Sequence, residues 1–279
     1  MRAQRLKTQP YKTGSMAKRA CLCLILCILV LAGTFSLRQK INLPEIFSLA
    51  PTAVPLRNTP PPAKEERASR EIAVTGRSWY ALQLGAFTQE NAAHQLSQEF
   101  IPRGAAGHIR EEGGIFRVYA AAYPTRAEAQ SVQKRLSEQG VTTYIQTCDT
   151  QALALRAAGS KKQLDAVCEV IGYLDGLSMK FFTLSSQLDK GEMTLSEANG
   201  ALTSEGATCR ALCTLLTNAF DGTLPDAAEL LHTALSAVAL ICENGQNSQS
   251  AARTGAALKG CHLTVISELS KIASALPRK

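Results

Sequence analysis

The stretch Tyr80-Ala-Leu-Gln-Leu-Gly-Ala-Phe87 recurs 36 residues later as Phe116-Arg-Val-Tyr-Ala-Ala-Ala-Tyr123. Each copy begins with apolar residues at alternate positions, which is the period of a strand with one buried face. Each copy continues with apolar residues three and four positions apart, the period of a helix, and ends on a second short strand. Gly113-Gly114 joins the copies. The repeat therefore predicts an α+β unit of order β-α-β-β-α-β, in which a four-stranded antiparallel sheet carries two helices on one face.

Alternation along the predicted strands assigns each side chain to one face of the sheet. Leu82, Leu84 and Val118 point toward the helices. The opposite face gathers amides, guanidiniums, an imidazole and two phenols: Gln83, His108, Arg110, Arg117, Tyr119, Tyr144 and Gln146. Planar hydrogen-bonding groups and aromatic rings suit a sugar chain. The alternative is a solvated surface, because antiparallel sheets commonly leave one face in water.

Residues 78–147 resemble the SPOR domain, the peptidoglycan-binding module of cell-division and sporulation proteins. The resemblance rests on four segments, which are Tyr80–Phe87, Asn91–Leu96, Gly114–Tyr119 and Thr125–Ala129. It implies that the polar face binds glycan strands stripped of their stem peptides, as found at division septa. It also implies that Gln83 is the amide of the first strand, and that Arg117 and Tyr119 lie on the third.

The charge distribution argues against nucleic acid as a partner. The net charge is +7, but residues 1–40 carry eight Lys or Arg and no acid, so the rest of the chain has a net charge of −1. A sheet of this topology also occurs in RNA-binding folds. Residues 78–147 hold six basic and six acidic residues, which is not the basic footprint that nucleic acid requires.

Residues 20–37 form an 18-residue run without charge, and six Lys or Arg precede it. This length just suffices for a membrane-spanning helix, and the positive-inside rule places residues 1–19 in the cytoplasm. A cleaved signal peptide is the alternative, with Ser48-Leu-Ala50 as a cleavage site far from the apolar run. We expect an uncleaved single-pass anchor in the cell membrane, with the bulk of the chain outside the cytoplasm.

Two further segments complete the predicted domain organisation. Residues 38–77 are rich in proline, which disfavours helix and sheet, and are predicted to be an extracytoplasmic linker. The SPOR-like domain is assigned to residues 78–148 and a helical bundle to residues 149–279. In the bundle, four stretches with helical spacing are separated by Gly191, Gly222 and Gly245. Short connections between amphipathic helices favour an antiparallel bundle, of unknown function.

The chemistry of the predicted bundle is sparse. His232 and His262 each lack the second histidine and carboxylate of a metal site. Five cysteines in the bundle and Cys148 could be core residues, zinc ligands or disulfide partners, and no CxxC spacing favours zinc. We expect buried free thiols for most of them, and one disulfide between helices stays open as an alternative. No Ser-His-Asp set, phosphate loop or paired acid stands out, so we expect neither enzyme activity nor a metal or cofactor.

The sequence thus favours a membrane-anchored, noncatalytic protein that binds peptidoglycan glycan strands at sites of division or sporulation. One alternative is an extracytoplasmic scaffold, whose bundle binds another membrane or cell-wall protein and whose sheet no longer binds glycan. A wall hydrolase with its site in the bundle is a third class, for which the sequence contains no supporting motif.

Overall fold

The computed structural model describes residues 67–150 and 152–275. The predicted cytoplasmic tail, the predicted spanning helix at 20–37 and most of the predicted linker lie outside these ranges. Among the described helices, none has the length and apolar character that a bilayer crossing needs.

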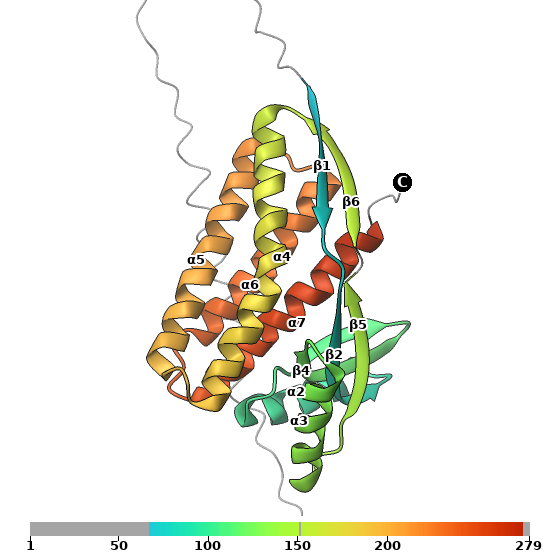
Figure 1. The fold of residues 1–279 in the computed structure, drawn as a ribbon, viewed down its shortest axis with the longest axis vertical. Coiled ribbons are helices and arrows are strands. Elements are labelled where there is room, and N and C mark those ends of the chain that lie inside the picture. Colours follow the sequence, from blue (N-terminus) through green and yellow to red (C-terminus); the bar gives the residue numbers. More distant parts are fainter. Residues whose placement is uncertain (1–66, 151, 276–279) are drawn as a thin grey trace, which may run out of the picture. The chain divides into compact units, whose positions relative to one another are not determined.

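The repeat forms the predicted β-α-β-β-α-β unit. Its elements are β2 (Arg77–Phe87), α2 (Glu90–Phe100), η1 (Ile101–Arg103), β3 (His108–Glu112), β4 (Ile115–Tyr123), α3 (Arg126–Glu138) and β5 (Tyr144–Thr150). The strands make one antiparallel sheet in the order β3-β4-β2-β5, which confirms the predicted topology (Figure 1). Helices α2 and α3 share one face, where Leu82, Ala120 and Ala129 form a core cluster. Thr125 and Glu128 form the predicted capping box of α3.

Four helices follow in the described residues after 159, as the apolar spacing predicts. They are α4 (Lys161–Lys190), α5 (Leu195–Ala219), α6 (Asp226–Gly245) and α7 (Ala251–Ala275). Capping boxes at Ser160/Gln163 and Thr194/Glu197 begin α4 and α5, and Gly191 ends α4 in the left-handed region at φ 73°. Each helix packs against the next along the chain, and α7 closes the bundle against α4. Their apolar faces form one core cluster that includes Phe181, Leu202 and Leu235.

The end of the predicted linker is a strand rather than an extended tether. β1 (Ala68–Val74) pairs antiparallel with β6 (Leu153–Gly159), which lies in the segment assigned to the helical bundle. Ile72 and Val74 are buried in the bundle core, while the alternate residues Glu71 and Ala73 are exposed. The prolines that led us to predict a linker end at Pro62, whereas Ile72 and Val74 show the alternation of a half-buried strand.

The second face of the sheet is not open along its whole length, which corrects our prediction. Helix α7 packs on one end of this face, against β3, β4 and β5. Leu263 and Ile266 of α7 form a cluster there with Trp79, Ala81 and Tyr119, which is separate from the bundle core. The apolar spacing of α7 indicates one buried stripe that faces the bundle, but its residues Thr254–Leu269 are buried on nearly every side.

Two histidines lie in this contact between α7 and the sheet. The His262 ring packs edge-on against Trp79, with 4.4 Å between ring centroids, and burial lowers its pKa to about 3. His108 of β3 lies 3.1 Å from Ser267 Oγ of α7. Burial, together with the positive charges of Arg110 and Lys271, lowers the pKa of His108 to about 4. Both rings are therefore neutral at neutral pH.

A single substitution tests whether β1 belongs to the folded core. Ile72→Ala should lower the free energy of unfolding by about 2 to 5 kcal/mol, because it removes buried methyl groups and leaves a cavity. Ala73→Ser, on the exposed side of the same strand, should change the free energy of unfolding by less than about 0.5 kcal/mol. Urea denaturation of the two variants measures the difference. Equal stabilities would contradict the placement of β1.

Acid should destabilise the contact between α7 and the sheet. The folded pKa of His262 lies below the unfolded value of about 6.5, so the unfolded chain binds the proton first as the pH falls. Stability is complete above about pH 6.5 and is lost as the pH falls toward the folded pKa, by about 2 kcal/mol at about pH 5. In thermal melts, His262→Gln should reduce this pH dependence, and His94→Gln, at an exposed position, should not. If the pH dependence of the stability is unchanged in His262→Gln, then protonation of His262 is not what destabilises the contact.

Candidate functional site

The structure brings all seven predicted site residues onto one face of the sheet. The cross-strand pairs are His108–Tyr119, Arg110–Arg117, Gln83–Tyr119 and Gln83–Tyr144, and Gln146 lies opposite Ala81. Gln83 lies on this face by alternation with Ala81 along β2, and the register of β2 against β4 shifts on both sides of it. This irregularity sets Gln83 opposite Tyr119 and leaves Leu84 on the helical face.

Hydrogen bonds, ion pairs and a cation–π contact join five of the seven residues into a polar network, namely Gln83, Arg110, Arg117, Tyr119 and Gln146. Arg117 Nη1 donates to Gln83 Oε1 over 3.1 Å, and the Tyr119 hydroxyl donates to Gln146 Oε1 over 2.7 Å. The Arg110 guanidinium lies 5.7 Å from the centroid of the Tyr119 ring. Burial raises the pKa of Tyr119 above the usual phenol value, so this hydroxyl keeps its proton and acts as a donor.

Glu112 is a member of this network that the sequence analysis missed. It forms an ion pair with Arg110, and its Oε2 lies 3.3 Å from Arg117 Nε. The alternation His108, Arg110, Glu112 along β3 could have revealed it, because every second residue of a strand shares a face. Glu112 holds the two guanidiniums together on adjacent strands, where they would otherwise repel each other.

The two arginines retain hydrogen-bonding capacity that the described residues do not use. The Nε atoms of Arg110 and Arg117 are buried and make no hydrogen bond, although Arg117 Nε lies near Glu112. An unused buried donor costs free energy, and polar ligand atoms are one means of satisfying it. Arginine suits ligands that present several acceptors, because its planar fork offers donors in fixed directions.

The network lies at the end of the face that α7 leaves uncovered. Tyr144 is 62% exposed, and Arg110, Arg117 and Gln146 are partly exposed. Tyr119 is only 1% exposed, and His108 contacts Ser267 and Thr264 of α7. The face therefore has an accessible end and a covered end, with Tyr119 at the boundary. Because Tyr119 is buried, we expect its replacement to lower the stability of the fold.

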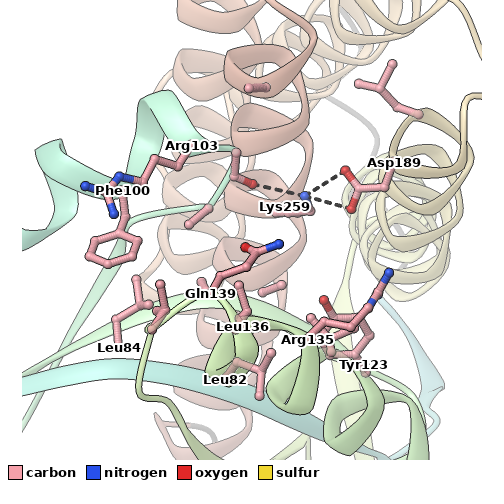
Figure 2. A pocket seen from close by; sticks show the side chains of 18 of the residues that line it. Leu82, Leu84, Phe100, Arg103, Tyr123, Arg135, Leu136, Gln139, Asp189 and Lys259 are labelled. Carbon is pink, nitrogen blue, oxygen red and sulfur yellow. Dashed lines mark hydrogen bonds and ion pairs between the residues drawn. The ribbon is translucent and has the colours of Figure 1, made fainter.

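A large cleft lies beside the same contact, between α2, α3 and the bundle. Its volume is about 600 Å³, and Figure 2 shows Leu82, Leu84, Leu136 and Phe100 among its lining residues. Lys259 of α7 extends from the helical bundle toward the SPOR unit. Its Nζ lies 2.8 Å from Asp189 Oδ2 of α4 and donates to the Gly104 carbonyl oxygen over 3.0 Å (Figure 2). The SPOR unit and the helical bundle are therefore in contact, but an open space remains beside that contact.

The cysteines of the described residues are free thiols. Cys148, Cys209, Cys213, Cys242 and Cys261 are buried, and Cys168 is partly exposed. The Sγ atoms of Cys242 and Cys261 lie 3.6 Å apart between α6 and α7. No group of three or more metal-ligating side chains occurs within residues 67–150 and 152–275.

Comparison with known proteins gives one result that matches this geometry. Residues 76–147 match the family model of the SPOR domain. The match spans the four-stranded sheet and both of its helices, and it ends before β6 and the bundle. Neither the comparison with curated proteins nor that with solved structures yields a match. The SPOR domain is a peptidoglycan-binding domain associated with cell division, and this chain is a SPOR domain-containing protein.

Proposed function

We propose that this chain is a membrane-anchored, noncatalytic protein that binds denuded glycan strands at sites of cell division or sporulation. The observation that carries the proposal is the pair of partly exposed arginines, Arg110 and Arg117, held by Glu112 and the buried Gln83 beside the exposed Tyr144 ring on the uncovered end of the SPOR sheet. A glycan offers hydroxyls to the amide and the guanidiniums, and it offers the apolar face of a pyranose ring to the exposed Tyr144 ring.

The membrane anchor in this proposal rests on the sequence of residues 1–40. The uncharged run at 20–37 has the length of a spanning helix, and the basic residues before it favour a cytoplasmic N-terminus. The SPOR domain would then lie on the side of the membrane where peptidoglycan is found. The stretch from Leu37 to Ala68 would separate the sheet from the bilayer.

The scaffold alternative has one observation in its favour. Helix α7 covers Trp79, Ala81 and part of Tyr119 on the face where a glycan would lie. If that cover is permanent and the accessible end is too small to bind a glycan, the bundle and sheet together form a surface for another protein. Glycan binding by the intact chain distinguishes the two functions.

Variants on the accessible end of the face test glycan binding. Arg117→Ala and Tyr144→Ala should each weaken binding to denuded peptidoglycan by about 1 kcal/mol, or about fivefold, because each removes a hydrogen-bonding or stacking contact. Arg126→Ala removes an exposed arginine from α3 and should bind like the parent. Sedimentation of the full-length protein with purified sacculi measures the affinities. Unchanged binding by both site variants would favour the scaffold function.

Limited proteolysis tests the proposed topology. A protease added outside intact protoplasts should degrade residues 67–279, because the positive-inside rule places them outside the cytoplasm. The same treatment of lysed protoplasts serves as the control for accessibility. Protection of these residues in intact cells, with degradation after lysis, would reverse the orientation and separate the chain from peptidoglycan.

A further inference from the structure

We propose that the helical bundle regulates the glycan site, and that α7 is a removable cover on the sheet face. In the closed state described here, α7 hides Trp79, Ala81, Tyr119 and His108 from a ligand. In an open state, the bundle moves away as a body, and the whole length of the face becomes available. This inference rests on the proposed glycan binding and concerns its control.

The covalent connections permit such a movement. Only two crossings of the chain join the sheet to the rest of the described residues. One is Thr75-Gly76 between β1 and β2, and the other lies between Thr150 and Ala152. The two crossings run side by side, since a Cβ added at Gly76 would lie 2.6 Å from the Ala152 backbone nitrogen. Two adjacent crossings can act as a hinge, because a few residues at element ends absorb the rotation.

The two parts have separate cores. The residues of α7 that face the sheet, Leu263 and Ile266, belong to the interface cluster. The residues that face the other helices, such as Leu258 and Val265, belong to the bundle core. β1 stays with the bundle, because Ile72 and Val74 pack in the same bundle core. Opening therefore exposes the interface cluster and leaves both cores intact.

The contact contains polar atoms that its closure leaves unsatisfied. Trp79 Nε1 and His262 Nε2 are buried between the two parts without a hydrogen-bond partner. Each such group carries a desolvation cost that water or a ligand relieves when the contact opens. Clefts of about 600 Å³ and about 580 Å³, each lined by residues of both parts, border the contact. A permanent interface usually has the packing density of a protein interior, which these features do not provide.

Besides the apolar cluster, the polar contacts that hold the cover closed include His108 with Ser267 and Lys259 with the Gly104 carbonyl oxygen, and two more lie at the edges of the contact. Arg77 Nη1 donates to the Asp175 carbonyl oxygen over 2.9 Å, and its Nη2 lies 3.5 Å from Asp175 Oδ2. Ser270 Oγ donates to the Asp149 carbonyl oxygen over 3.3 Å at the other side of the contact. These contacts are exposed or partly buried, where such pairs contribute little, so a ligand that binds the hidden face can compete with them.

Trp79 makes the opening measurable without a label. It is the only tryptophan of the chain, and it is 1% exposed beneath α7. In the full-length protein, Ile266→Asp should shift Trp79 emission to the red and increase acrylamide quenching, because a carboxylate in the apolar contact disfavours closure. The far-ultraviolet circular dichroism should not change. Asp175→Arg, which opposes Arg77 with a like charge outside both cores, should produce a smaller shift in the same direction.

The same variants then test the control of glycan binding by sedimentation with denuded sacculi. Ile266→Asp should bind about tenfold or more tightly than the parent, because the binding-competent state no longer has to be populated at the expense of the closed one. Leu240→Asp is the matched control, since Leu240 of the same bundle is already 54% exposed. Its emission and its affinity should equal those of the parent.

The outcomes separate this inference from the proposed function. A red shift of Trp79 emission together with tighter glycan binding supports both the removable cover and the proposed function. A red shift with unchanged or weaker binding overturns the cover, while the proposed glycan function stands. If neither the parent nor the red-shifted variant binds glycan, the proposed function itself is overturned. If neither Ile266→Asp nor Asp175→Arg shifts the emission, the bundle does not separate from the sheet and the cover is overturned.

Discussion

The arrangement of this protein depends on the need of one helix to bury two faces at once. Helix α7 presents Leu258, Cys261 and Val265 to the other helices and Leu263 and Ile266 to the sheet. A helix with apolar residues on two faces cannot lie at the surface of a bundle without exposing one of those faces to water. The SPOR sheet supplies the second surface, so the fourth helix of the bundle also covers part of the sheet face opposite α2 and α3. This shared helix explains why the two parts of the described chain pack against each other.

The two-stranded ribbon of β1 and β6 is a second connection between the SPOR unit and the bundle, and it is made by paired strands rather than by a shared helix. It continues the central strand β2 and the edge strand β5, which pair in the SPOR sheet, into the bundle side of the structure. Gly76 marks the change from one pairing to the other, at a point where the neighbouring backbone leaves no room for a side chain. The SPOR unit is therefore inserted between β1 and β6, and the folded bundle includes residues on both sides of it in the sequence.

The sequence predicted the local structure well and the long-range packing poorly, for a physical reason. The strands and helices of the repeat follow from periodicity, and capping pairs such as Thr125 and Glu128 mark helix starts through contacts three residues apart. The shared face of Gln83, Arg117 and Tyr119 follows from alternation within strands. The contact of His262 with Trp79 joins residues 183 positions apart, and no local period encodes which surface a second apolar stripe will meet. Glu112 was within reach of alternation, whereas the burial of Tyr119 required knowledge of α7.

The packing of the bundle also determines how its thiols behave toward oxidants. Cys242 and Cys261 have sulfur atoms 3.6 Å apart, yet both side chains are fully buried. Burial raises the pKa of Cys261 well above its usual value, which suppresses the thiolate that reacts with oxidants and disulfides. Cys168 differs, because it is partly exposed and its sulfur lies 3.5 Å from Arg70 Nη1. An oxidising environment would therefore meet Cys168 first, and the interior thiols would stay reduced for as long as the bundle remains folded.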